Sequence, residues 1–216
     1  MSEPDSNQNT QNKVALITEI ATLLHEQGFR LALHYRNSRA EAKALQEKLH
    51  AIRADSVILI QADLHVTKGL SALVKSTLES FSRLDVVINN ASSFYPTPVG
   101  EITTTDWDRL MGSNLKAPLF LSQAAAPALE KTQGSIVNII DIHAERPMRE
   151  HVVYSIAKSG LLAMTKSLAR ELAPAIRVNG VAPGAILWPE NEGDESAHQE
   201  ILSRTALKQA GSPEDI

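Results

Sequence analysis

Tyr154 and Lys158, four positions apart, are the residues of this chain best placed to do chemistry together. On a helix, residues four apart lie on one face, one turn from each other, and the apolar spacing from Ser159 to Leu172 predicts a helix. An ammonium beside a phenol favours the phenolate, which lowers the tyrosine pKa from about 10 and makes the phenol a usable proton donor. A half-buried tyrosine beside a solvated lysine would show the same spacing, so the pair needs support from the rest of the chain.

Short apolar, β-branched runs alternate with helical patterns along the chain. This alternation predicts an α/β fold with a doubly wound, Rossmann-like parallel sheet covered on both faces, in which ligands bind outside the carboxyl ends of the strands. The predicted strands are Val14–Thr18, Phe29–Tyr35, Ser56–Gln61, Leu84–Asn89, Ser135–Ile140 and Ile176–Val181. The predicted helices are Ile20–Gln27, Ala40–Ile52, Leu70–Phe81, Thr105–Leu129 with Pro118 and Pro127 as interruptions, and the segment that carries Tyr154.

Polar or turn-forming residues lie at or just after the ends of four of the predicted strands. Any one set could be an ordinary turn, because Asn, Asp, Gly and Pro favour turns for backbone reasons. Since the carboxyl ends of parallel strands share one edge of the sheet, all four sets should converge on one crevice. They are Asp63 after the third strand, Asn89-Asn90-Ala91-Ser92 at the fourth, Asp141 after the fifth and Pro183-Gly184 after the sixth.

These residues, taken together with a helical asparagine, resemble the motifs of the short-chain dehydrogenase/reductase family. From Asn114 there are 27 residues to Asp141, then 13 to Tyr154 and 4 to Lys158, in agreement with that family. The family normally has serine where this chain has Asp141. This departure, together with the runs at 34–38 (HYRNS) and 90–98 (NASSFYPTP), resembles the pteridine reductase branch. The matching motifs are Asn89-Asn90-Ala91, Asn114, Tyr154, Lys158 and Pro183-Gly184, and the resemblance runs from about Lys13 to the last residue.

The resemblance implies a catalytic role for four residues. Tyr154 would donate the proton, Lys158 would depress the tyrosine pKa and hold the nicotinamide ribose, and Asn114 would anchor the water chain that resupplies the proton. Asp141 would face the substrate. A ketone reductase needs a neutral hydroxyl donor there. A pterin instead presents ring N–H groups, from which a carboxyl group can accept a hydrogen bond, and imine nitrogens, to which it can give a proton.

Two further residues are candidates for substrate contact. Phe94 offers a flat apolar face on which a pterin ring could stack against the nicotinamide, although a loop aromatic packed into the core is the alternative. Ser92 could bond the pterin or a cofactor phosphate. With Asp141 and Tyr154 they make up the predicted substrate site.

The end of the second strand indicates the cofactor. Sites for NAD usually place a carboxylate there for the ribose hydroxyls, whereas Arg36, Asn37 and Ser38 bring one guanidinium and no acid, which suits the 2′-phosphate of NADPH. Arg36 could also be an exposed loop arginine. By resemblance, Asp63 and Leu64 would meet the adenine, and the remaining cofactor contacts would come from Asn90, Ala91, Ser92, Lys158, Pro183 and Gly184.

The chain departs from the family after its first strand. The family has a Thr-Gly-x-x-x-Gly type of loop whose glycines let backbone N–H groups approach the pyrophosphate. Here the strand from Val14 runs to Thr18, Glu19 brings a negative charge, and the glycine loop and the start of the helix are absent. One residue between strand and helix is too few, since βα loops take about 2–6, so the local structure must be rearranged.

The chain also stops at Ile216, where relatives continue into a helix and a last strand that edges the sheet and joins subunits. We therefore expect the last strand to be missing and the family's homo-oligomer to be in doubt. A shortened isoform, a degraded gene copy and a faulty gene model would all give such a sequence.

Composition sets the remaining bounds. Of the 216 residues, 43% are hydrophobic, cysteine is absent, and the net charge of −4 comes from interspersed charges, so disulfides, thiol chemistry and a nucleic-acid surface are not expected. Residues 1–12 should form a disordered tail and 13–216 a single domain in a cytoplasmic protein without a membrane segment.

The segment Leu187–Gln199 could close over substrate or be a solvated loop, and we expect Trp107 in the core. No metal site is expected, because most of the histidines other than His34 should be solvated and show no ligand spacing: His25, His50, His65, His143, His151 and His198.

The sequence thus favours an NADPH-dependent oxidoreductase acting on pteridines of the dihydropterin or dihydrofolate type, with cofactor binding impaired by the missing glycine loop. A generic short-chain carbonyl reductase is one alternative, against which Asp141 and Phe94 argue. A non-catalytic relative that acts as a binding partner of an intact subunit is the other.

Overall fold

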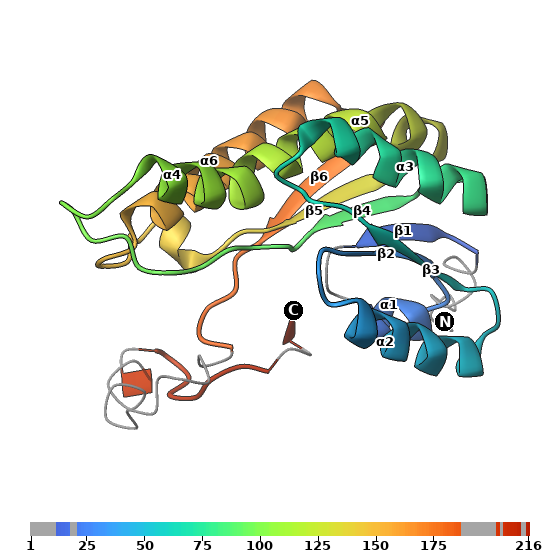
Figure 1. Ribbon diagram of the computed structural model, residues 1–216, viewed down its shortest axis with the longest axis horizontal. Helices are drawn as coiled ribbons and strands as arrows, with labels where there is room; N and C mark the ends of the chain where they lie inside the picture. Colours follow the sequence, from blue (N-terminus) through green and yellow to red (C-terminus); the bar gives the residue numbers. More distant parts are fainter. Residues whose placement is uncertain (1–11, 18–20, 187–201, 204, 213–214) are drawn as a thin grey trace, which may run out of the picture.

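The computed structural model describes residues 12–17, 21–186, 202–203, 205–212 and 215–216 (Figure 1). The predicted tail, apart from Asn12, lies outside the described residues. So do Thr18 to Ile20, the segment 187–199 and His198.

Six parallel strands form a single sheet in the order β3-β2-β1-β4-β5-β6, which confirms the predicted doubly wound α/β fold. Strand β1 lies in the middle of the sheet, hydrogen-bonded to β2 on one side and β4 on the other, and all four of its residues are buried. The strand bounds are β1 (Val14–Ile17), β2 (Arg30–Tyr35), β3 (Val57–Gln61), β4 (Val86–Asn89), β5 (Ser135–Ile139) and β6 (Arg177–Val181).

The helices divide between the two faces of this sheet (Figure 1). Helices α1 (Thr22–Glu26) and α2 (Arg39–Ile52) cover one face, and the helices that follow β3 in the chain lie on the opposite face. None of the described helices is long and apolar enough to cross a membrane. The remaining helical segments are α3 (Thr67–Phe81), α4 (Thr104–Met111), the π turn η1 (Gly112–Lys116), α5 (Ala117–Thr132), the 3-10 turn η2 (Ile142–Ala144) and α6 (Val152–Glu171).

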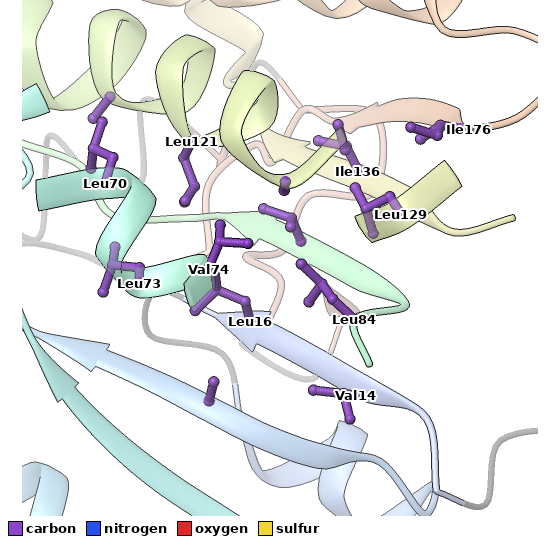
Figure 2. Close-up of a cluster of buried hydrophobic side chains, with 14 of the residues drawn as sticks. Val14, Leu16, Leu70, Leu73, Val74, Leu84, Leu121, Leu129, Ile136 and Ile176 are labelled. Carbon is purple, nitrogen blue, oxygen red and sulfur yellow. The ribbon is translucent and has the colours of Figure 1, made fainter. Parts of the chain in front are cut away.

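The main core lies between the sheet and the pair α3 and α5. Figure 2 shows Leu73 of α3 and Leu121 of α5 among the buried side chains that meet Leu16 of β1 and Ile136 of β5. Each such side chain contributes about 1.5–3 kcal/mol when fully buried. A second cluster, which includes Leu31 and Leu49, lies under α1 and α2. The sheet is therefore held from both faces, as near-continuous apolar strands require.

The helix predicted at Thr105–Leu129 is divided, although not by its prolines. Pro118 lies in the first turn of α5, where a missing N–H and a fixed φ are tolerated. Pro127 lies inside α5, which continues to Thr132. The interruption is instead the π turn η1 between α4 and α5, and it contains Asn114.

The connection from β1 to α1 resolves the spacing problem seen in the sequence. The strand ends at Ile17 and the helix begins at Thr22, two residues later than predicted. Four residues therefore separate them, within the usual range of about 2–6 for a βα loop. The cost is helix length: α1 has only five residues, and its N-cap residue, Ala21, makes no side-chain cap hydrogen bond.

Candidate active site

The predicted catalytic residues meet at the carboxyl edge of β4 and β5. Asp141 follows β5, and Tyr154 and Lys158 lie near the start of α6. Asn114 comes from η1, beside the loop that leaves β4. Three segments of the chain thus supply one group of polar side chains.

Asp141 uses its two carboxylate oxygens for different tasks. Oδ1 accepts from the backbone N–H of His143 at 2.8 Å and so caps the turn η2. Oδ2 accepts from the hydroxyl of Tyr154 at 2.6 Å. Because the capping bond fixes the rotation of the carboxylate, the oxygen next to the tyrosine is held in place before any ligand binds.

Tyr154 is 4% exposed, and its pKa is raised above the ordinary value of 10. Burial is the main cause, followed by the hydrogen bond to Asp141 and the charge of that carboxylate, while the interaction with the Ser92 side chain acts in the opposite direction. The sequence-based prediction that this pKa is lowered is therefore wrong for this structure. The phenol keeps its proton at neutral pH.

Lys158 has its own place in the site. Its Nζ donates to the backbone oxygen of Ile139 at 2.9 Å and lies 5.6 Å from the centroid of the Tyr154 ring. The side chain is 3% exposed, and burial lowers the lysine pKa to about 8, although the charge of Asp141 raises it. The ammonium is thus held at the end of β5 and does not determine the tyrosine pKa.

Asn114 ties the loop after β4 to the helix. Its Oδ1 accepts from Ser92 Oγ at 2.8 Å, and its Nδ2 donates to the backbone oxygens of Ser93 and Leu110, each at 2.9 Å. A π turn displaces one residue from the regular helical ladder and is frequent at functional sites. The carboxamide therefore holds Ser92 next to Tyr154, while its expected role in a water chain stays a prediction.

Phe94 lies beside Tyr154. It is 47% exposed, so it is not packed into the core, and its ring meets the Tyr154 ring edge-on at 4.9 Å between centroids. One face of Phe94 stacks on His151 at 4.6 Å, with 12° between the planes. The sequence analysis counted His151 among the solvated histidines and so missed this contact. The only sequence signal for it was the position of His151, three residues before Tyr154.

Apart from these residues, a hollow with a volume of about 140 Å³ lies at the carboxyl ends of β2 and β3. Arg36 and Asp63 form an ion pair across it at 3.1 Å, with 51% and 38% of their side chains exposed. Such exposed pairs contribute only about 0–1 kcal/mol, so the guanidinium can exchange its partner at little cost. The sequence analysis missed His34, Tyr35, His65, Ser93 and Ser113 as lining residues. The full lining is His34, Tyr35, Arg36, Asp63, Leu64, His65, Ala91, Ser92, Ser93 and Ser113.

The carboxyl group of Asp63 is poised as an anion. Its Oδ1 accepts from the backbone N–H of His65 at 3.0 Å, which is the main cause that holds its pKa below the usual range. Burial opposes this effect, and the charge of Arg36 adds to it. The predicted adenosine end of the site thus carries one fixed acceptor and one exchangeable cation.

Other predicted cofactor residues lie differently. Asn37 and Ser38 are exposed and do not line this hollow, whereas Leu64 lines it and also packs into the main core. Pro183 lies beside Asp141, since its backbone oxygen accepts from the N–H of Ile142 at 3.3 Å. The half-buried Asn90 leaves β4 next to Ala91, and the Cβ position of Gly184 faces open space.

Two expectations about single side chains are wrong. Trp107 is 45% exposed rather than in the core, and His25, expected to be solvated, is 1% exposed. In the part of the chain that the structure describes, no group of three or more His, Asp and Glu side chains is arranged to hold a metal ion.

The site fits the two ends of a nicotinamide dinucleotide and not its middle. Lys158 and Tyr154 stand where a nicotinamide ribose would be held, and Arg36 and Asp63 where the adenosine would be. Between them, the end of β1 offers no glycine, because the first glycine of the chain is Gly28, beyond α1. With five residues and no N-cap bond, α1 makes no substitute for a pyrophosphate-binding helix start.

Comparisons with known proteins identify related chains. A family model described as enoyl-(acyl carrier protein) reductase matches residues 13–216. The chain is 37% identical to pteridine reductase 1 of Leishmania tarentolae over 225 residues, which cover 82% of this chain and 78% of that protein. It is 30% identical over 185 residues to an uncharacterized oxidoreductase of Staphylococcus aureus strain USA300, with 81% and 78% covered. The 225 aligned positions outnumber the residues in 82% of this chain, so the Leishmania protein carries extra residues within the aligned stretch.

Proposed function

The chain belongs to the short-chain dehydrogenase/reductase family of oxidoreductases, and we propose that within it this chain is a pteridine reductase by descent. Its substrates would be pteridines of the dihydropterin or dihydrofolate type, and its cofactor NADPH. The observation that carries the proposal is the 2.6 Å hydrogen bond from the Tyr154 hydroxyl to Oδ2 of Asp141. A carboxylate at this position changes what the site can recognise.

The Asp141–Tyr154 pair suits a nitrogen heterocycle better than a ketone. A carboxylate accepts from ring N–H groups, which pterins have and simple carbonyl compounds lack. A tyrosine with a raised pKa is a weak acid, and an imine nitrogen is a stronger base than a carbonyl oxygen, so it is the better acceptor for that proton. Phe94, beside Tyr154, adds an aromatic wall for a flat ring.

The cofactor would be held by residues at both ends of the crevice. Lys158 would hold the nicotinamide ribose, and Arg36 would leave Asp63 to take the 2′-phosphate of the adenosine. A nicotinamide ring bound there supplies the hydride. Because the β1–α1 connection has no glycine cradle, we propose that this chain binds the cofactor weakly.

The same missing cradle favours a second candidate function. A chain that keeps the fold and the substrate-facing residues without firm cofactor binding could serve as a non-catalytic partner of an intact reductase subunit. A calorimetric titration with NADPH separates the two candidates: weak but saturable binding supports the reductase, and an absence of binding supports the partner role.

The substrate proposal is tested with Asp141→Ser, in this chain and in one carrying a Thr-Gly-Gly-x-x-Arg-Ile-Gly segment inserted after Ile17. Reduction of a dihydropterin should fall about ten- to a hundredfold, because a hydrogen bond to a charged group is worth about 1.5–3 kcal/mol. Reduction of a simple carbonyl compound should not fall. Equal losses on both substrates would make Asp141 a structural carboxylate and remove the basis for a pteridine substrate.

A further inference from the structure

A buried polar cluster lies at the amino ends of the strands, on the sheet edge opposite the catalytic residues. It joins His25 of α1, Arg53 at the end of α2 and Ser56, which precedes β3. His25 and Ser56 are each 1% exposed. The reaction proposed above makes no use of this cluster.

The hydrogen bonds within the cluster require a neutral imidazole. Ser56 Oγ donates its only proton to the backbone oxygen of Arg53 at 2.5 Å. The 2.7 Å contact between Ser56 Oγ and His25 Nε2 must therefore be a bond donated by the imidazole. Nδ1 is then bare, and within the described residues it has no hydrogen-bond partner. A second proton on His25 would be a buried N–H without an acceptor.

The charges around His25 disfavour that second proton as well. Arg53 donates to the backbone oxygens of His25 and Phe29, and His50 of α2 adds a further positive charge when protonated. Burial is the main cause that lowers the His25 pKa below 6.5, and the charges of Arg53 and His50 follow. The carboxylate of Glu26, next to His25 in α1, acts against them. Arg30 at the start of β2 adds to the positive charge around Arg53.

Helix α1 depends on this cluster more than a longer helix would. Five residues are too few for a helix to be stable alone, since isolated helices shorter than about 12–15 residues are marginal in water. His25 is the buried residue of α1, Leu23 is 55% exposed, and Leu24 is only partly buried against the smaller core cluster. The bonds to Ser56 and from Arg53 are thus the main polar anchors of α1.

We propose that His25, Ser56 and Arg53 form an acid-sensitive latch, which holds α1 on the sheet at neutral pH and releases it when His25 gains a proton. Since the folded pKa is below the unfolded value of 6.5, the latch contributes fully above pH 6.5 and is lost as the pH falls below it. Release would free α1 and the turn that leads from it into β2. The proposal goes beyond the reductase function and does not depend on it.

Hydrogen exchange of the intact chain between pH 7.5 and pH 5 tests the latch, with exchange expressed as protection factors to remove the intrinsic effect of pH. The amides of Gln27, Gly28 and Phe29 follow α1 and donate to carbonyl oxygens within it. They should lose protection by about tenfold for each unit by which the folded pKa is lowered. Amides in the middle of α5 should keep theirs. Equal losses in α1 and α5 would mean global unfolding and would overturn the latch.

Variants locate the titrating group. In His25→Gln, the side-chain amide can still donate to Ser56 and cannot be charged, so α1 should no longer respond to acid. His50→Gln is the matched control and should keep the response. His34, whose pKa is also lowered, mainly by burial, lies on β2 and would loosen the β2–β3 pairing rather than α1. A His25→Gln chain that opens in acid like the parent contradicts the proposal.

Glu26→Gln provides a test that leaves the buried groups intact, should His25→Gln fail to fold. The substitution removes the carboxylate charge of Glu26, which favours protonated His25. The release of α1 should therefore move to lower pH. An unchanged or higher pH of release would exclude His25 as the trigger.

Discussion

At the scale of single residues, the site is governed by the partner of each titratable group. Tyr154 bonds to a carboxylate, and Lys158 bonds to a backbone oxygen on β5. The usual expectation for a tyrosine and lysine four apart, a lowered phenol pKa, fails because burial and the Asp141 charge both favour the neutral phenol. Asp141 thus adds to the effect of burial and makes the tyrosine hold its proton more firmly.

Asp141→Asn should therefore lower the Tyr154 pKa, because it removes the negative charge next to the phenol and keeps a side chain of the same shape. Burial remains, so the value should stay above the ordinary 10. NMR titration of tyrosines labelled at Cζ measures this, with Tyr154→Phe to assign the signal. Asp106→Asn, whose carboxylate instead raises the pKa of Tyr95, is the control and should leave Tyr154 unchanged. A Tyr154 pKa unaffected by Asp141→Asn would show that burial alone raises it.

At the scale of elements, the π turn η1 is what positions Asn114. It begins at Gly112, against which the His65 ring packs so closely that an added Cβ would lie 2.5 Å from Nδ1 of that ring. His65 also lines the hollow with Arg36 and Asp63. The close approach at Gly112 thus places Asn114 near the predicted adenosine end of the site.

Gly112→Ala should destabilise the chain by about 1–3 kcal/mol, because the His65 ring must move to make room for the methyl group. Gly69→Ala is the matched control: it lies in α3 with nothing within 4 Å of its Cβ position, so alanine should stabilise by about 0.5–1 kcal/mol. Urea unfolding gives both free energies. Changes of the same sign in the two variants would contradict the close approach of His65.

At the scale of the whole molecule, the sheet brings both ends of a dinucleotide site to one edge, while the connection between β1 and α1 leaves the middle unsupported. A pyrophosphate normally accepts several backbone N–H groups at a glycine turn. Each bond to a charged group is worth about 1.5–3 kcal/mol, so losing two or three removes about 3–9 kcal/mol, whereas micromolar binding amounts to about 8 kcal/mol in total. Glu19 adds a negative charge in the same connection.

The unmodified chain should therefore bind NADPH more weakly than micromolar and show little turnover. Insertion of the Thr-Gly-Gly-x-x-Arg-Ile-Gly segment after Ile17 should restore affinity by supplying the missing N–H donors. Calorimetric titration of both chains at one salt concentration is the measurement. Micromolar binding by the unmodified chain would refute the proposal of impaired cofactor binding.

The sequence by itself determined the parallel sheet, the strands within one or two residues, and which tyrosine, lysine, asparagine and aspartate are the candidates for catalysis. These features are encoded locally, by apolar periodicity and by spacing along one chain. Helix α1 was placed two residues too early, because its start depends on the room that the turn after β1 requires.

Only the tertiary structure decided the properties that depend on distant partners. The direction of the Tyr154 pKa, the stacking of Phe94 on His151 and the burial of His25 against Ser56 each join segments that no spacing rule connects. Hydrogen bonds form only when donor and acceptor lie within about 3.5 Å. The charged form of a group is penalised only where its neighbours exclude water. Both conditions depend on how the elements pack. Apolar periodicity predicts which face of a helix or strand is buried, but it does not predict which atoms come into contact.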